Sequence, residues 1–113
     1  MEFSRLYDLI EERNEEQRMK ALQEAKRLSI VLGKQFPYEK AYLFGSVLEK
    51  GRFTKHSDID MVIRGLDDAF FLKAYAFLLG ESSFPIDLRP WELLDEKTRK
   101  KVEEEGAVLD GKE

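Results

Sequence analysis

The chain has 113 residues, 42% of them hydrophobic, a formal net charge of −4 and no cysteine. This length accommodates one core and not two, so we expect one domain spanning residues 1–113. The apolar fraction excludes intrinsic disorder, and the negative charge argues against general nucleic-acid binding. The missing cysteines exclude a disulfide framework and thiolate chemistry, and the single histidine disfavours zinc.

Membrane attachment is not indicated by the sequence. No run of about eighteen or more apolar residues occurs, and Met1 and Glu2 do not open a basic-then-apolar leader. We therefore expect a soluble protein that acts in the cytoplasm without contacting a membrane.

The first predicted element is a long helix over residues 4–32, a stretch without proline or glycine and rich in helix-forming residues. Gly33 and Pro37 are expected to end it. Its apolar residues fall into two stripes, separated by the wholly polar segment Glu11–Arg18. Two helices joined by a solvated bend are an equally good interpretation. The stripe expected to pack on a sheet consists of Leu22, Ala25, Leu28, Ser29 and Leu32.

The other stripe of this helix consists of Phe3, Leu6, Tyr7 and Ile10. An isolated apolar patch of this kind often marks an interface. We therefore expect these residues to contact a partner protein or a second copy of the chain, so a homo-oligomer is one of the open alternatives.

Two strands follow, and they frame the most informative part of the chain. The apolar run Tyr42–Phe44 ends at Gly45 and Ser46, residue types typical of a tight turn. The second strand starts at Asp58 and alternates, so that this carboxylate and that of Asp60 emerge on one face. Two residues along a strand span about 6.6 Å. Both carboxylates are then able to bind a common pair of divalent ions.

The loop between these strands, Glu49–His56, carries Lys50, Arg52 and Lys55 against one acid. This basic patch lies beside the candidate site in the sequence and suits a polyphosphate ligand. An ordinary solvated loop explains the same residues equally well. Ser57, directly after the loop, either orients the following aspartate or only helps to start the strand.

The rest of the chain predicts two more helices and a third strand. In chain order, we expect a helix at Ala69–Leu79 ended by Gly80, a strand at Phe84–Arg89, a helix from Leu93 or Asp95 to Glu105 before Gly106, and a short strand at Val108 and Leu109. The order α-β-β-α-β-α predicts an α+β domain with a small mixed sheet flanked by helices.

The third strand contains a lone acid, Asp87, between Ile86 and Leu88. A carboxylate in that setting is costly unless it meets a partner or a cation. If it converges with Asp58 and Asp60, the three charges repel one another, and a bound cation relieves the repulsion. Because carboxylate oxygens suit hard cations, these acids predict a site for Mg²⁺.

The segment GSVLEKGRFTKHSDID, residues 45–60, resembles the Gly-Ser…Gly…Ser-Asp-Ile-Asp signature of the DNA polymerase β-like nucleotidyltransferase superfamily. The size, the third acid and the final EEEGAVL are similar to the minimal nucleotidyltransferases, small proteins often encoded beside a helical HEPN protein as a toxin–antitoxin pair. The resemblance covers most of residues 40–109. One departure is the interval between Ser46 and Gly51, which is one residue longer than the common family pattern.

The resemblance implies a role for each matching residue. Gly45 and Ser46 correspond to the turn that holds the phosphates of the nucleotide. Asp58 and Asp60 correspond to the ligands of two Mg²⁺ ions. Asp87 corresponds to the third acid, which completes metal binding or activates the attacking hydroxyl. The further candidates for contact with the nucleotide are Lys50, Arg52 and Ser57.

The activity implied by the resemblance is Mg²⁺-dependent transfer of AMP, or another nucleoside monophosphate, from ATP or a related triphosphate to a hydroxyl. Among the minimal nucleotidyltransferases the hydroxyl belongs to a tyrosine of the HEPN toxin, and its modification silences the toxin. The chain is therefore expected to be an antitoxin enzyme. Two alternatives stay open: a module that neutralises its partner by contact alone, and a nucleotidyltransferase that acts on a small molecule.

Overall fold

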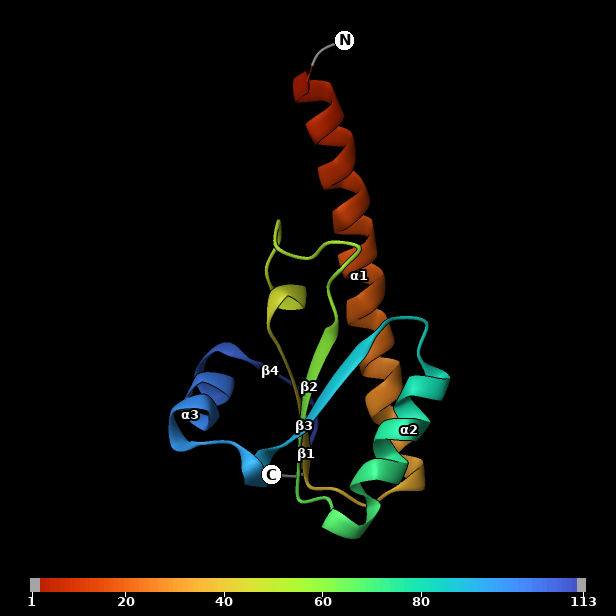
Figure 1. Ribbon diagram of the computed structural model, residues 1–113, viewed down its shortest axis with the longest axis vertical. Helices are drawn as coiled ribbons and strands as arrows, with labels where there is room; N and C mark the ends of the chain where they lie inside the picture. The colour runs from red at the N-terminus through yellow and green to blue at the C-terminus, as the bar shows by residue number, and fades with distance from the viewer. Residues whose placement is uncertain (1–2, 112–113) are drawn as a thin grey trace.

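The computed structural model describes residues 3–111, within which three α-helices and four strands form (Figure 1). The predicted α+β order is confirmed, and a fourth strand covers the short one expected at Val108 and Leu109. Short 3-10 turns at residues 46–48, 68–70 and 91–93 join some of these elements. The helices and strands are α1 (Phe3–Gln35), β1 (Lys40–Phe44), β2 (Ile59–Arg64), α2 (Phe71–Glu81), β3 (Ile86–Pro90), α3 (Glu96–Glu105) and β4 (Ala107–Gly111).

The four strands form one mixed sheet in the spatial order β3-β2-β1-β4. β1 pairs antiparallel with β2 and β4, whereas β2 and β3 are parallel. Helices α1 and α2 cover one face of the sheet, and α3 lies against the other (Figure 1). The sheet therefore lies between two helical layers, which explains why β2 is apolar on both faces.

The side chains of β2 alternate between these two layers, as the sequence predicted. Ile59, Met61 and Ile63 belong to the larger core, which the sheet shares with α1 and α2. Val62 belongs to a smaller core on the α3 side. Asp60 precedes Val62 by two residues and therefore lies on the same face. The strand thus directs one predicted site carboxylate toward the α3 side of the sheet.

Helix α1 is one continuous helix of 33 residues, so the interpretation as two helices with a bend is wrong. It also continues through Gly33, near which the sequence predicted its end, and stops at Gln35. Gly33 is not among the glycines with positive φ, and the helix ends where Pro37 prevents continuation. The stripe expected to face the sheet does so: Ala25, Leu28, Ser29 and Leu32 are fully buried.

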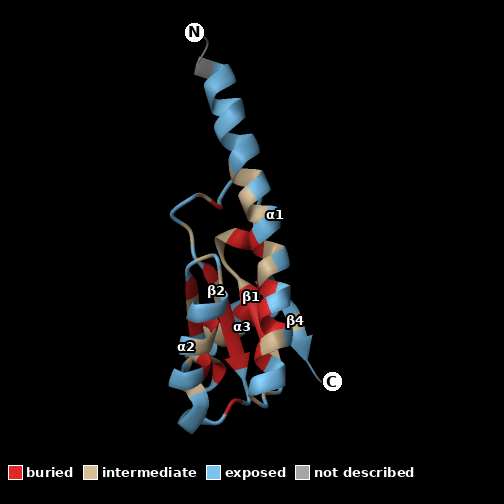
Figure 2. Ribbon diagram, turned by 90° about the vertical axis from the view of Figure 1, so that its right-hand side faces the viewer, coloured by how far each residue is buried: buried red, intermediate tan, exposed pale blue. Residues whose placement is uncertain are grey.

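The N-terminal part of α1 extends past the end of the sheet (Figures 1 and 2), and its residues 4–13, all of them exposed, form an N-terminal arm. Leu6, Tyr7 and Ile10 are 39%, 66% and 48% exposed on it, and the side chain of Phe3 lies outside the described part. Their contact with a partner or a second copy stays a prediction. Although α1 is long, no helix within residues 3–111 is both long and apolar enough to cross a membrane.

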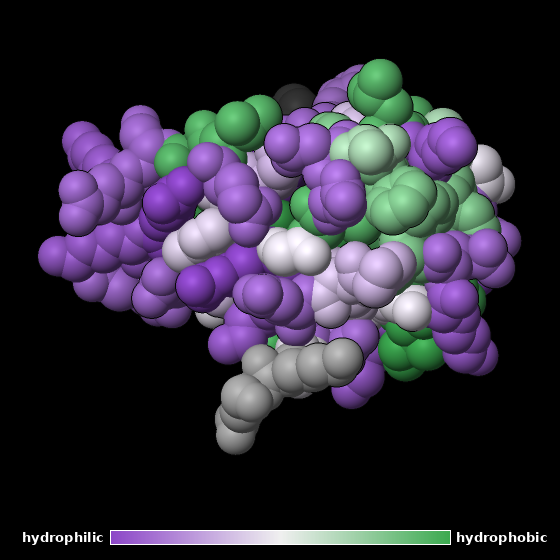
Figure 3. Space-filling model, turned by 90° about the horizontal axis from the view of Figure 1, so that it is seen from below, coloured by the Kyte–Doolittle hydropathy of each residue, from purple (hydrophilic) through white to green (hydrophobic). Residues whose placement is uncertain are grey.

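Helix α2 begins and ends later than the sequence predicted. Asp67 caps a 3-10 turn at residues 68–70 by accepting a hydrogen bond from the Ala69 N–H at 2.9 Å, and α2 starts only at Phe71. Gly80 does not end the helix, which runs to Glu81. Seen from below, the end of the molecule at which α2 begins carries both apolar and polar surface (Figure 3).

Helix α3 ends at Glu105 as predicted but starts at Glu96, because Leu93 belongs to a 3-10 turn and Asp95 is the residue that caps the helix. The Asp95 carboxylate caps it by accepting a hydrogen bond from the Thr98 N–H at 2.6 Å, and Gly106 follows its last residue. Val102 anchors α3 on the sheet, where it packs with Tyr42. This packing brings the end of α3 to the end of β1.

Candidate active site

The three predicted acids are brought together at one end of the sheet by strand pairing. Asp60 in β2 lies opposite Phe44 of β1 and opposite Asp87 of β3 in the register of the sheet. Asp58 precedes β2 directly. The acidic cluster, defined as Asp58, Asp60 and Asp87, is therefore centred on Asp60, with the end of β1 on its other side.

The electrostatics of the acidic cluster show that these carboxylates interact. Burial, followed by the negative charges of Asp87 and Asp58, raises the pKa of Asp60 to about 6, and Arg89 offsets part of this rise. Arg89 pairs with Asp87, with 3.2 Å between its Nη2 and Oδ2 of the acid. The cluster therefore holds more negative charge than its own arginine neutralises, which favours binding of a cation.

Gly45 occupies a position that no other residue type fits. Its φ of 87° lies in the left-handed region, and a Cβ built on it would lie 2.5 Å from Oδ2 of Asp60. The glycine thus lets the backbone approach the central carboxylate of the acidic cluster. The turn that follows is held in place because Val47 is fully buried and its carbonyl accepts a hydrogen bond from Nη1 of Arg18 at 3.1 Å.

A cleft of about 660 Å³ opens at this end of the sheet. Its volume is within the usual range for small-ligand sites. The predicted residues Gly45, Ser46, Arg52 and Asp60 line it together. Five further lining residues were not predicted from the sequence: Phe44, Leu48, Glu49, Lys101 and Glu105.

Two of the unpredicted lining residues, Lys101 and Glu105, come from α3. They lie four residues apart and therefore share one helix face. This spacing is visible in the sequence, but only the packing of α3 beside β1 shows that the face meets the cleft. The sequence alone gives no signal that would select these two residues among the many charges of α3.

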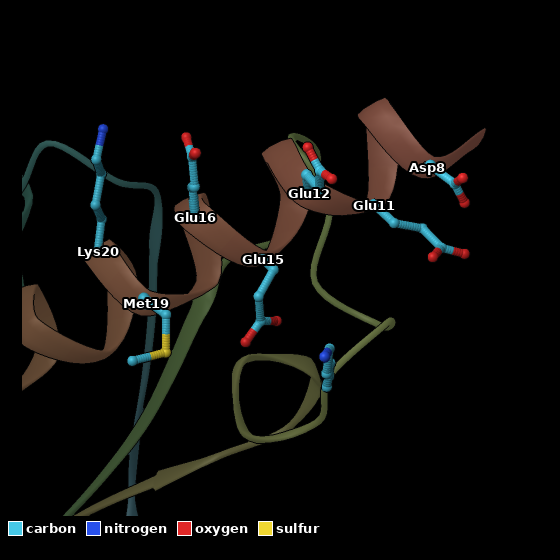
Figure 4. Close-up of a pocket in the computed structure, with 8 residues that line it drawn as sticks. Asp8, Glu11, Glu12, Glu15, Glu16, Met19 and Lys20 are labelled. Carbon is cyan, nitrogen blue, oxygen red and sulfur yellow. The ribbon is translucent and has the colours of Figure 1, made fainter. Parts of the chain in front are cut away.

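The basic residues predicted for the nucleotide take different positions. Arg52 lines the cleft, where its guanidinium forms an ion pair with Glu49. Lys50 instead lines a separate groove beside the N-terminal arm, together with acidic residues of α1 that include Glu15 and Glu16 (Figure 4). A hydrogen bond from Arg18, with a smaller contribution from the charge of Lys50, lowers the pKa of Glu15. The predicted contact of Lys50 with a nucleotide stays a prediction.

Ser57 has a structural position within the loop before β2. Its Oγ accepts a hydrogen bond from the Thr54 N–H at 2.9 Å, and its own N–H donates to the Thr54 carbonyl at 3.0 Å. These two bonds close a turn directly before Asp58. Ser57 therefore shapes the approach to the acidic cluster, and its contact with a nucleotide also stays a prediction.

The donor set of the acidic cluster fits a hard divalent cation. Carboxylate oxygens are the ligands that Mg²⁺ prefers, and a cation would offset both the burial and the neighbouring negative charges that raise the pKa of Asp60. Within residues 3–111 no three acidic or histidine side chains are already gathered closely enough to hold an ion. Metal binding would therefore require the carboxylates of the acidic cluster to come closer together.

Carboxylates that converge beside a Gly-Ser turn, at one end of a small mixed sheet, are the parts of a phosphoryl- or nucleotidyl-transfer site. Residues 18–110 match the nucleotidyltransferase domain family, and the chain belongs to this family. The prediction that the chain is a nucleotidyltransferase is thereby confirmed. No curated protein is similar enough in sequence to count as a match.

Solved structures show the same fold. A chain of a toxin–antitoxin complex with AMP-PNP has a TM-score of 0.64 at 22% identity, covering 78% of this chain and 74% of that one. A chain from a mutant of the MntA-HpeT toxin–antitoxin complex has a TM-score of 0.59 at 27% identity, with 74% and 70% covered. A chain from the tri-AMPylated Shewanella oneidensis HEPN toxin with its MNT antitoxin gives 0.58 at 23% identity, with 77% and 70% covered.

Replacing Gly45 with alanine is expected to damage the site and the fold together. The added Cβ meets Oδ2 of Asp60 and occupies a strained backbone conformation, so we expect a loss of about 1–3 kcal/mol in the free energy of unfolding. Displacement of Asp60 should also remove most of the Mg²⁺-dependent binding of ATP. Thermal unfolding and calorimetry measure the two effects.

The matched control for this variant is Gly65→Ala. Gly65 also has a positive φ, of 79°, but lies at the far end of β2 from Asp60, where its Cβ would lie 2.4 Å from Cγ and 2.8 Å from Cβ of Glu39. This control should lower the melting temperature and leave ATP binding intact. Loss of ATP binding in both variants, or in neither, would contradict the role assigned to Gly45.

Proposed function

We propose that the chain transfers AMP from ATP to a hydroxyl of a partner protein, a tyrosine of a HEPN-type toxin, and thereby acts as an antitoxin in the cytoplasm. The observation that carries this proposal is the position of Asp60, which lines the cleft beside the Gly45 turn and is paired in the sheet with Asp87 of β3. Support also comes from the similar solved structures, which are toxin–antitoxin complexes, one with AMP-PNP and one with a tri-AMPylated HEPN toxin.

The reaction assigns distinct roles to the acidic cluster and to the turn at Gly45 and Ser46. The acceptor oxygen forms a bond to the α-phosphorus, and the bond from this phosphorus to the bridging oxygen breaks. Pyrophosphate leaves with the bonding electron pair, and the hydroxyl proton passes to a carboxylate, for which Asp87 is our candidate. Gly45 and Ser46 hold the phosphates through backbone N–H groups and a hydroxyl.

Asp58, Asp60 and Asp87 are the residues that would hold Mg²⁺, and two ions are the number we propose. When bound, the ions supply charge that stabilises the attacking and leaving oxygens. The carboxylates themselves position the ions because β2 and β3 fix their backbones in adjacent register. Their mutual repulsion without a cation is consistent with this role.

The proposal is tested with the full chain, a HEPN-type protein encoded beside its gene, Mg²⁺ and ATP labelled in the α- or the γ-phosphate. We expect the α-label to enter the partner protein and the γ-label to stay out, because pyrophosphate is the leaving group. The partner should gain mass in steps of one AMP, and tyrosine should carry it. A partner that is neutralised without gaining label would instead identify a contact-only antitoxin, and label found only on small molecules would identify a nucleotidyltransferase that acts on a small molecule.

A further inference from the structure

We infer that Lys101 of α3 binds the β- and γ-phosphates of the nucleotide and stabilises the pyrophosphate as it leaves. This inference rests on the proposed function, since it assigns a residue to the triphosphate end of the same cleft. Lys101 lies outside the basic loop at residues 49–56, which contains the cations predicted from the sequence to contact the nucleotide.

The end of α3 is held beside the end of β1. Val102 is fully buried in the smaller core, and a Cβ on Gly106 would lie 2.4 Å from the Val102 carbonyl oxygen and 3.1 Å from that of Leu43. The backbone at the end of α3 therefore packs closely on the last residues of β1. Lys101 directly precedes the buried Val102, so its backbone is anchored while its side chain is exposed in the cleft.

The charges that line the cleft single out Lys101. The lining includes three carboxylates, Glu49, Asp60 and Glu105, and two cations, Arg52 and Lys101. Arg52 is already paired with Glu49. No ion pair joins Lys101 to a carboxylate within residues 3–111. The Lys101 ammonium is therefore the cleft cation that a ligand meets without first breaking an ion pair.

The chemistry of the leaving group suits a lysine at this position. A lysine ammonium is a compact charge with three donors and binds phosphate oxygens through charge-assisted hydrogen bonds. Negative charge grows on the bridging oxygen and the pyrophosphate as the bond from the α-phosphorus breaks. A cation placed there binds the transition state more tightly than the bound substrate, so it raises kcat as well as affinity.

The matched pair for a test is Lys101→Met and Lys100→Met. Both remove one exposed charge from α3, but Lys100 does not line the cleft and its Nζ lies 4.0 Å from Oε1 of Glu104. Calorimetry with Mg²⁺ should show that K101M weakens ATP binding about 10- to 100-fold and leaves AMP binding unchanged, because AMP lacks the β- and γ-phosphates. K100M should change neither affinity more than about twofold. Lys101→Arg should restore part of the ATP affinity.

Transfer assays complete the test. In K101M, kcat for transfer to the partner should fall in addition to the loss of ATP affinity, with an unchanged melting temperature. If K101M binds ATP as tightly as the wild type, or if ATP and AMP affinities fall equally, the role of Lys101 is wrong while AMP transfer by the wild type would still support the proposed function. If the wild type transfers nothing, the proposed function fails, and the ATP-versus-AMP comparison still decides whether Lys101 binds the outer phosphates.

Discussion

Asp60→Asn is expected to abolish AMP transfer while leaving the fold intact. The amide has nearly the volume of the carboxylate but lacks the charge that attracts the metal ions. Asp60 is also the central acid of the cluster, since it lies between β1 and β3 and next to Gly45. Loss of a metal-binding charge at the reacting centre should lower the rate at least about 100-fold. Transfer of α-labelled AMP to the partner measures this loss. Asp58→Asn should act in the same way.

The same substitution is expected to stabilise the metal-free protein at neutral pH. Folding raises the pKa of Asp60 from 3.8 to about 6, so the folded state favours the protonated carboxyl. The resulting stability is fully present below about pH 4 and is lost as the pH rises through about 6. An asparagine escapes that loss. Because Asp60 is partly hydrated, we expect the variant to gain about 1–2 kcal/mol above pH 7 and almost nothing near pH 4.

Denaturant unfolding in chelator at several pH values measures this gain. The control is Asp68→Asn, which removes one charge from an exposed residue of the turn before α2, at the opposite end of β2 from Asp60. It should change neither transfer nor the pH dependence of stability. If Asp60→Asn transferred AMP normally, the catalytic assignment would be wrong. If its stability relative to the wild type did not depend on pH, folding would not raise the pKa of Asp60 as inferred.

Two glycines show which helix ends the sequence predicted and which it did not. Gly106 ends α3 as expected, and a Cβ there would approach carbonyl oxygens of both α3 and β1. Gly80 was expected to end α2 for the same local reason, yet it lies inside the helix with nothing within 4 Å of the position of its Cβ. In both cases the signal in the sequence is a glycine at the end of a helical run. The packing of α3 on β1 leaves no room for a side chain at Gly106, whereas no neighbouring atom excludes a Cβ at Gly80.

The candidate site divides in a similar way. Gly45, Asp58 and Asp60 stand within one continuous signature, because the turn after β1 and the paired strand β2 are joined by a short loop. Asp87 was visible as an acid between two apolar residues of a strand. Lys101 and Glu105 were not predicted because their place in the cleft depends on how α3 returns across the sheet. Neither helical spacing nor charge encodes that return, and only the three-dimensional packing reveals it.

ATP binding is expected to depend on a divalent cation, which is the second large effect. Without metal, the acidic cluster repels the triphosphate. Burial, and after it the negative charges of Asp87 and Asp58, already raise the pKa of Asp60. With Mg²⁺ or Mn²⁺ the same acids attract it through the bound ions. Calorimetry should therefore show ATP affinity at least about tenfold weaker in chelator than in Mg²⁺.

Asp60→Asn separates this metal effect from any general loss of binding. With one fewer negative charge beside the phosphates, the variant should bind ATP in chelator at least as tightly as the wild type does, but should gain little when Mg²⁺ is added. The substitution should therefore strengthen ATP affinity or leave it unchanged without metal, and weaken it strongly when Mg²⁺ is present. Equal ATP affinity of the wild type in chelator and in Mg²⁺ would contradict the metal site. A variant that loses affinity equally in both conditions would show that Asp60 supports the shape of the cleft instead of holding an ion.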